Sequence, residues 1–471
     1  MVFSSLLFLF RFLPIVLLGY FATPKKFRNL FLLLFSLVFY AWDTPKFLVI
    51  MLVSIAVNYA GGILVDKFKA QLKDGMAKLA LIATSVIDLG ILGVFKYTNF
   101  VFENINAIFG TEFVSSFVLP IGISFYTFQM MSYVIDVYRG DTPVQKNIVN
   151  FGCYVSLFPQ LIAGPIVQYK TVAEQLDSRQ ESYEKFALGI KRFVVGLSKK
   201  VLIANSVGAL WESIAAMDVA TLPTLTAWLG IIAYTLQIYF DFSGYSDMAI
   251  GLGKMFGFEF LENFNYPYIS KSITEFWRRW HISLGSWFRD YVYIPLGGNR
   301  RGFLIQLRNI FVVWMLTGIW HGASWNFFAW GVYFGIILII EKLFLLKLLN
   351  KLPSFISHIY ATLLFVYGWV IFYFKGEGCM GRIWDYTKAL FGGTGCAYNE
   401  ESLFILLNYA LILVIGIIGA TPLCKKLFAK AEEKCSNVAY VLSLVLVAAG
   451  FLLTVTYLVA AENNPFLYFD F

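Results

Sequence analysis

Charged residues are scarce in this chain. Asp, Glu, Lys and Arg make up only 14% of its 471 residues, whereas a soluble domain carries about 25%. Hydrophobic residues make up 59%, and the mean hydropathy is +0.70. This balance excludes a soluble globular protein. It predicts an all-α, multi-pass membrane protein, because backbone groups inside a bilayer must be satisfied within a helix.

Cysteine and histidine are also rare, and the common chemical motifs are missing. The five cysteines are scattered without a CxxC or Cys/His metal spacing, so no metal site is expected. The sequence has no Walker motif and no Ser-His-Asp ordering. Its net charge of +8 is explained by the basic loops that orient a membrane protein, so no nucleic-acid partner is expected.

Apolar segments predict about eleven full spans together with re-entrant or interfacial helices, in one domain over residues 1–471. Several segments are broken by proline, as at Pro120, Pro159 and Pro165. Such breaks at membrane depth occur where the backbone is buried in protein or lines a cavity. The predicted apolar segments are Phe3–Phe21, Leu30–Trp42, Phe47–Val65, Leu79–Phe95, Phe113–Val137, Ile148–Val167, Phe193–Leu210, Leu225–Phe240 continuing to Leu252, Ile310–Trp320, Phe327–Ile340, Ile359–Phe374, Leu403–Ala420 and Val438–Ala460.

Basic loops predict which connections face the cytosol. The first loop contains Lys25, Lys26 and Arg28, and the third has four lysines between residues 67 and 78. The second loop, residues 43–46, carries one Lys and one Asp. By the positive-inside rule the first and third loops are cytosolic, and the N-terminus lies outside. The other loops predicted to be cytosolic are Arg139–Lys146, Asn299–Arg308, Lys342–Lys351 and Lys425–Lys434.

This topology places His321 deep in the membrane. The apolar stretch that ends at His321 begins beside a basic loop, and the next one ends at Glu341 and Lys342, again beside basic residues. We therefore expect a hairpin anchored in the cytosol. Thirteen residues separate Arg308 from His321, or about 20 Å along a helix. His321 should thus lie past the midplane of a hydrocarbon core about 30 Å thick, reachable through a funnel from outside and a tunnel from inside.

The segment Ile273–Tyr293 is too charged to span the membrane. Its periodicity predicts one amphipathic helix that lies in the interface or packs beside the hairpin. Arg278 and Arg289 are eleven residues apart and should share a polar face. The aromatic face is formed by Trp277, Trp280 with His281, Leu284 and Phe288.

Histidine inside a membrane is a candidate for acid–base chemistry, because its free pKa is near neutrality. His321 can accept the proton of a hydroxyl whose oxygen attacks a thioester or ester carbonyl. The alternative is an imidazole that only hydrogen-bonds a neighbouring helix. His281 can orient the acyl group or polarise its carbonyl, or it can be the polar tip of an interfacial helix. His358, beside a basic loop, is expected to be structural.

Other polar residues surround these candidates in the sequence. Asp241 can form a salt bridge with Arg278 or Arg279, or neutralise a substrate amine. Small residues after His321 let a substrate approach closely. We expect supporting or tunnel-lining roles for Trp320, Gly322, Ser324, Asp241, Ser243, Tyr245, Arg278 and Arg279.

Three stretches carry a family resemblance. They read DFSGYSDMAIGLG from Asp241, FWRRWHISLGSWFRDYVYIPLGGNR from Phe276 and IWHGASWNFFAWG from Ile319. Together they resemble the membrane-bound O-acyltransferases. The resemblance is strongest to the bacterial branch that includes the membrane subunit of the alginate O-acetyltransferase. MVFSSLLFLFRFLP, SYVIDVYRGDTP, LFPQLIAGPI and the final NPFLYFDF also resemble that branch, so the resemblance covers nearly the whole chain.

The resemblance implies a mechanism and a setting. His321, in the Trp-His-Gly motif, would be the catalytic base, and His281 would support it at a position where eukaryotic relatives often carry Asn. The family fold is a ring of helices with a thin centre and a tunnel between both faces. The donor would be cytosolic acetyl-CoA, used as a co-substrate without a bound cofactor. The acceptor would be an exported polysaccharide, or an SGNH-like partner acetyltransferase, outside a bacterial plasma membrane.

Two other functions stay open. The D-alanyl transferase of teichoic acid synthesis is a near relative of the same family, and its donor is a carrier protein. A polysaccharide exporter would perform no chemistry. Many transporters are built from two halves that are inverted repeats of each other. No such pair of repeats is visible in this sequence.

Cysteine-accessibility labelling tests the predicted topology. In a cysteine-free background, Pro45→Cys should react with a membrane-impermeant reagent on intact cells, and Lys69→Cys should react only after the cells are opened. Labelling of position 69 from outside would contradict the orientation.

Overall fold

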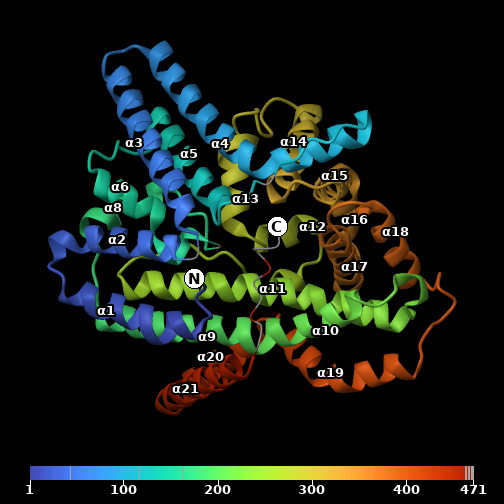
Figure 1. The fold of residues 1–471 in the computed structure, drawn as a ribbon. Coiled ribbons are helices and arrows are strands. Elements are labelled where there is room, and N and C mark those ends of the chain that lie inside the picture. The colour runs from blue at the N-terminus through green and yellow to red at the C-terminus, as the bar shows by residue number, and fades with distance from the viewer. Residues whose placement is uncertain (43, 116, 163, 462–463, 465–466, 468–471) are drawn as a thin grey trace. The chain divides into compact units, whose positions relative to one another are not determined.

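The computed structural model describes residues 1–42, 44–115, 117–162, 164–461, 464 and 467. Within these residues the chain folds into helices joined by turns and loops, with no strand (Figure 1). The predicted all-α architecture is confirmed. It follows from the long apolar runs, since a helix satisfies its own backbone in a bilayer.

Eight described helical segments are long and apolar enough to cross a membrane, so the predicted number of about eleven is not confirmed. Several predicted segments form shorter helices than expected. Ile148–Val167, for example, divides into α6 (Ile148–Ser156) and α7 (Phe158–Leu161) next to Pro159. The eight segments are Pro45–Ala70, Asp74–Phe109, Tyr183–Ala215, Thr224–Met255, Phe303–His321, Ser354–Tyr373, Glu400–Gly419 and Ser436–Ala460.

The described residues group into two compact units. The first comprises residues 1–193 and 245–262, and the second comprises residues 194–244 and 263–471. One functional domain over residues 1–471 stays a prediction. In the first unit α5 is almost entirely buried, so its polar side chains face protein. The helices of this unit are α1 (Leu13–Ala22), α2 (Arg28–Ala41), α3 (Leu48–Ala70), α4 (Asp74–Phe109), α5 (Ile123–Arg139), α6, α7 and α8 (Tyr169–Ser178), and α9 (Tyr183–Ser198) and α11 (Thr224–Met255) contribute to both units.

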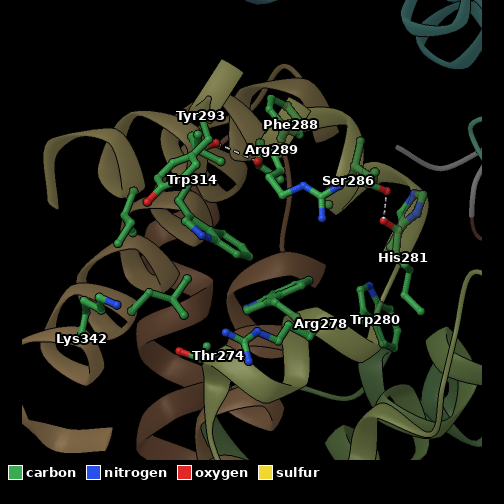
Figure 2. Close-up of a pocket in the computed structure, with 18 of the residues that line it drawn as sticks. Thr274, Arg278, Trp280, His281, Ser286, Phe288, Arg289, Tyr293, Trp314 and Lys342 are labelled. Atoms are coloured by element: carbon green, nitrogen blue, oxygen red, sulfur yellow. Dashed lines mark hydrogen bonds between the residues drawn. The ribbon is translucent and has the colours of Figure 1, made fainter. Parts of the chain in front are cut away.

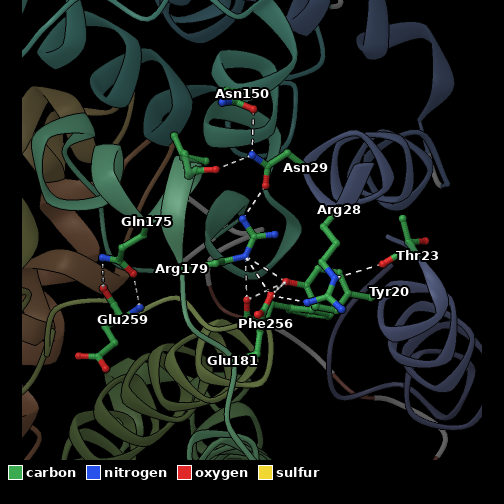
Figure 3. Close-up of polar contacts among 11 residues, drawn as sticks. Tyr20, Thr23, Arg28, Asn29, Asn150, Gln175, Arg179, Glu181, Phe256 and Glu259 are labelled. Carbon is green, nitrogen blue, oxygen red and sulfur yellow. Dashed lines mark hydrogen bonds and ion pairs between the residues drawn. The ribbon is translucent and has the colours of Figure 1, made fainter. Parts of the chain in front are cut away.

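A polar network joins helix ends within the first unit (Figure 3). Glu181 accepts a hydrogen bond from the Tyr20 hydroxyl at 2.7 Å and forms an ion pair with Arg28 at 2.7 Å. Arg179 donates to the Tyr20 hydroxyl and to the Phe256 carbonyl, each at 3.0 Å. Burial raises the pKa of Glu181, but the hydrogen bonds from Tyr20 and Arg28 outweigh it and bring the pKa below its ordinary value. The ionised carboxylate therefore ties the end of α1 to the start of α2.

In the second unit the structure corrects the helix predicted for Ile273–Tyr293. That helix is not continuous, because it is broken between α12 (Ile273–Arg279) and α13 (Ile282–Phe288). Trp280 is extended, with φ −101° and ψ 130°, and His281 is left-handed, with φ 43° and ψ 55°. The prediction of one continuous amphipathic helix is therefore wrong.

Hydrogen bonds from a distant segment explain the break. The Ile282 N–H donates to the Asn263 carbonyl, and the Asn265 N–H donates to the Arg279 carbonyl, each at 2.9 Å. These bonds satisfy backbone groups that a continuous helix would have paired internally. The other helices of this unit are α10 (Asn205–Ala215), α14 (Phe303–His321), α15 (Trp325–Ile340), α16 (Leu346–Leu349), α17 (Ser354–Tyr373), α18 (Cys379–Leu390), α19 (Glu400–Gly419), α20 (Leu423–Lys434) and α21 (Ser436–Ala460).

The predicted hairpin is present as α14 and α15, which pack along each other. α14 ends at His321, because Gly322 is extended with φ −174° and ψ 165°. Ser324, also extended, precedes the first turn of α15. The sequence therefore places His321 correctly at the tip of a helical hairpin.

Two glycines let α14 and α15 cross closely. A Cβ atom on Gly318 would overlap the Phe327 carbonyl oxygen. A Cβ atom on Gly331 would lie 2.5 Å from the Trp314 carbonyl oxygen. Both obstacles are backbone atoms that cannot turn aside, so the crossing requires glycine at both positions, as in many membrane helix pairs.

We therefore expect Gly318→Val to destabilise the hairpin, since overpacking typically costs about 1–3 kcal/mol. The measurement is the midpoint of thermal unfolding of the purified protein in detergent. Gly90→Ala is the matched control, because nothing lies within 4 Å of a Cβ there. Gly90→Ala should leave the midpoint of unfolding unchanged or raise it. An unchanged midpoint for Gly318→Val would show that the two helices do not cross tightly.

Candidate active site

A cavity of about 620 Å³ lies within the second unit (Figure 2). Its walls come from α12, α13, α14, the end of α15, and two π-helical turns, Arg289–Tyr293 and Glu341–Leu345. The volume falls in the range of small-molecule sites, about 300–1,000 Å³. The break between α12 and α13 allows residues from both sides of the predicted helix to face this one space.

One face of α14 lines the cavity and ends at His321. Ile310, Val313, Trp314 and Thr317 are separated by steps of three, one and three residues, and all lie on one side of the helix. His321 follows Thr317 by four residues, which keeps it on the same side. The helix thus presents the imidazole at one end of an otherwise mainly apolar wall.

Aromatic rings fix the orientation of His321. Its ring is nearly perpendicular to Trp330, at 5.0 Å between centroids, and to Phe372, at 5.2 Å. The Trp320 ring lies 5.1 Å away. Trp330 and Phe372 are both buried. This packing restricts the imidazole while leaving it in the cavity wall.

His281 is the second histidine in the wall and is only 3% exposed. Its Nδ1 lies 3.2 Å from Oδ1 of Asn263. Its ring is perpendicular to Phe242 at 4.7 Å and lies 6.4 Å from the Trp320 ring. Burial lowers the pKa of His281 to about 3. The imidazole is therefore neutral at physiological pH.

Three cationic side chains share the cavity with the histidines. They are Arg278 from α12, Arg289 from the turn after α13, and Lys342 from the turn after α15 (Figure 2). None of the described residues that line the cavity is acidic. Arg289 is also paired with Asp290 at 2.8 Å. The cavity is therefore electropositive and suited to an anionic ligand.

Asp241 and Arg279 do not line this cavity. Arg279 pairs with Glu275 at 2.9 Å. Asp241 pairs with Lys200 at 2.7 Å, and both side chains are 3% exposed. The predicted pairing of Asp241 with Arg278 or Arg279 is therefore wrong. A buried, mutually neutralised pair of this kind belongs to the internal structure.

Two described residues near the end of the chain, Asn464 and Leu467, belong to the hydrogen bonds around this ion pair. The Leu467 N–H donates to the second carboxylate oxygen of Asp241 at 2.9 Å. Asn205, which accepts from Lys200 at 2.8 Å, donates in turn to Asn464 at 3.0 Å. The remainder of the NPFLYFDF motif lies outside the described residues.

Two further predicted site residues lie in α11. Ser243 is buried in the second unit. Tyr245 belongs to the first unit, where its ring stacks on Phe3 at 4.6 Å. Neither is among the residues that line the cavity.

The small residues after His321 have packing partners. A Cβ atom on Gly322 would overlap the Phe327 ring, so this glycine makes room for an aromatic side chain. The Ser324 hydroxyl accepts a hydrogen bond from the Gly376 N–H at 3.1 Å. Both residues therefore shape the hairpin tip.

Comparison with known proteins decides the family. The sequence profile of the membrane-bound O-acyltransferase family matches residues 142–380, which include both cavity histidines. The chain belongs to the membrane-bound O-acyltransferase family. The resemblance in the sequence is thereby confirmed, and the protein is an acyltransferase of the membrane.

Several relatives of this acyltransferase match over most of their length. It is 42% identical to a probable alginate O-acetylase of Azotobacter vinelandii, with all of both chains covered. It is 32% identical to a peptidoglycan O-acetyltransferase of Helicobacter pylori, with 100% of this chain and 98% of the relative covered. A teichoic acid D-alanyltransferase of Bacillus subtilis is 29% identical over 48% of this chain and 59% of the relative.

Glu341 has a structural role in this acyltransferase that was not predicted from the sequence. Its buried carboxylate accepts from the backbone N–H groups of Ile273 and Thr274 at 2.7 and 2.8 Å. It also accepts from the hydroxyls of Thr274 and Tyr360, at 2.6 and 3.1 Å. Glu341 therefore holds the first turn of α12 against the end of α15. In the sequence, the signal that could have indicated this role is an acidic residue at the end of a long apolar run.

Substitution of His281 tests its part in the acyltransferase. His281→Asn should keep transfer within about tenfold of wild type, because asparagine tolerates the left-handed backbone and its amide still forms hydrogen bonds. His281→Ala should lose at least about tenfold, the equivalent of one hydrogen bond of about 1.4 kcal/mol. The measurement is the rate of acyl transfer at matched amounts of folded protein. Wild-type rates in both variants would show that His281 contributes only to packing.

Proposed function

We propose that this enzyme moves an acetyl group from a cytosolic thioester, acetyl-CoA as co-substrate, to an acceptor outside the membrane. The acceptor we infer is a hydroxyl of an exported polysaccharide, or an SGNH-like partner acetyltransferase that passes the group on. The observation that carries the proposal is the placement of two histidines and three cations in one cavity. Full-length relatives named for O-acetylation of alginate and peptidoglycan support an acetyl group and a polysaccharide.

His321 is the general base in this proposal. Its neutral imidazole accepts the proton of the acceptor hydroxyl while that oxygen attacks the thioester carbonyl. The C–O bond forms and the C–S bond breaks, and the imidazolium returns its proton to the departing thiolate. The perpendicular packing of Trp330 and Phe372 supports this role, because it keeps the ring oriented through both proton transfers.

The cations support a donor that carries phosphate. Lys342 belongs to a loop predicted to be cytosolic, and Arg278 and Arg289 line the same cavity. Guanidinium and ammonium groups bind phosphate by charge-assisted hydrogen bonds. Coenzyme A bears phosphates at one end and its thioester at the other, so phosphates near these cations let the acetyl group extend toward His321.

We infer that the cavity is the cytosolic part of a tunnel that joins both faces of a bacterial inner membrane. The distribution of basic loops supports an N-terminus outside and about eleven crossings, some made by helices shorter than a full span.

D-alanyl transfer from a carrier protein is the second candidate. Its phosphopantetheine arm would also bring phosphate to the cavity. The D-alanyltransferase relatives cover only about half of this chain, at 29% identity. Acetyl transfer is therefore favoured, and purified enzyme supplied with either acetyl-CoA or a D-alanyl carrier separates the two. An exporter is disfavoured, because the chain belongs to an enzyme family.

His321→Ala should lower acetyl transfer at least about a hundredfold, since general base catalysis contributes roughly 10²–10⁴-fold. His321→Gln should fail nearly as badly, because an amide hydrogen-bonds but has no basicity. The measurement is radiolabelled acetyl transfer by purified enzyme, with its partner if one is needed.

The matched control is His358→Gln. His358 lies outside the cavity lining and its Nδ1 donates to the Ser270 carbonyl at 3.1 Å. This variant should retain transfer. Near-normal transfer by His321→Ala, at a thermal stability equal to wild type, would remove His321 from the mechanism.

A further inference from the structure

We propose that Asn263 is a positioning residue that fixes His281 as the tautomer protonated on Nδ1, so that Nε2 is a hydrogen-bond acceptor. His281 then recognises a hydrogen-bond donor on the acyl donor and does not polarise the carbonyl. This assignment of a substrate contact rests on the proposed function, whereas the position of the proton on Nδ1 rests on geometry and the neutral state of the ring on its burial.

The amide oxygen of Asn263 faces the histidine. The backbone N–H of Ser283 lies 3.1 Å from that atom. A backbone N–H can only donate, so its partner is the amide oxygen and not the amide nitrogen. The orientation of the Asn263 side chain is therefore settled by the backbone of α13, which removes the usual ambiguity of an amide.

The Nδ1 atom of His281 carries the proton of the neutral ring. Its Nδ1 lies 3.2 Å from the same Asn263 oxygen. A bare Nδ1 would set two lone pairs against each other, so Nδ1 carries the hydrogen. The Ser283 hydroxyl donates its single proton to the Asn263 oxygen at 2.9 Å. The same hydroxyl lies farther from Nδ1, at 3.4 Å, so it is not the hydrogen-bond donor to Nδ1. A neutral imidazole has one N–H, so Nε2 keeps its lone pair.

Asn263 is held in place by burial and hydrogen bonding, and the His281 ring beside it is uncharged. Asn263 is 1% exposed, and its own carbonyl accepts the Ile282 N–H at 2.9 Å. One residue therefore holds both the backbone after His281 and the ring of His281. Because burial lowers the pKa of His281 to about 3, the ring does not acquire a second N–H at physiological pH.

The protonation of His281 determines which group of the substrate it can bind. A neutral His281 with a bare Nε2 cannot donate to a thioester carbonyl oxygen, but it can accept a hydrogen bond from an N–H or O–H group. The group we assign is an amide N–H of the pantetheine arm, which coenzyme A and a carrier-bound phosphopantetheine share. His281 would thereby align the arm whose acyl end reaches His321, in the cavity that both histidines line.

Nitrogen NMR of the ¹⁵N-histidine-labelled enzyme tests the tautomer directly. The chain has three histidines, so His321→Gln and His358→Gln assign the signals. We expect His281 in the wild-type enzyme to show protonated Nδ1 and bare Nε2. Asn263→Leu should move it toward protonated Nε2, and acetyl transfer should fall about tenfold or more, as when a partner that orients a histidine is removed.

Two variants keep the test decisive even where Asn263→Leu folds poorly. Asn263→Asp retains an acceptor for Nδ1–H, so the wild-type tautomer and most of the transfer should return. Ser283→Ala leaves the bond between Asn263 and His281 in place, so neither readout should change.

A bare Nδ1 in the wild-type spectrum would overturn the proposal, as would a tautomer switch in Ser283→Ala. The unchanged tautomer in a folded Asn263→Leu variant would overturn it as well. Failure of the proposed function looks different, because the wild-type enzyme would then show the expected spectrum without acetyl transfer.

Discussion

The backbone break at Trp280 and His281 is the constraint on which the rest of the cavity depends. In one straight helix the aromatic residues and Arg278 would occupy different faces. The break brings Trp280, Arg278 and Arg289 to the same cavity. A left-handed residue such as His281 costs about 1–2 kcal/mol relative to helical backbone. The bonds from the Asn263 segment offset that cost and also hold the ring.

The cavity needs a fixed wall opposite this break, and the hairpin of α14 and α15 supplies it. Glycines at 318 and 331 bring the two backbones into direct contact, which fixes the face of α14 that ends at His321. Glu341 then links the two walls, because its carboxylate at the end of α15 accepts the first N–H groups of α12. An anion at the start of a helix is also favoured by the helix dipole.

The sequence predicted the hairpin and failed to predict the break, for a physical reason. The apolar runs around His321 are bounded by charged residues, so their ends and their fold follow from local composition. The break depends on Asn263, which lies 18 residues before His281. Such a bond leaves no trace in helical periodicity. The pairing of Asp241 with Lys200 was missed likewise, since nothing in local spacing marks one cation over another.

The distribution of charge separates structure from binding in the second unit. Charge in a medium of low dielectric is costly unless it is paired. Asp241 is paired with Lys200, and Arg279 is paired with Glu275. In the cavity, Arg289 is paired with Asp290, whereas the described lining holds Arg278 and Lys342 beside two histidines and no acidic residue. Cations gathered in this way are stabilised by water or by an anionic ligand, so the phosphate of the proposed thioester donor would complement the positive charge of this cavity.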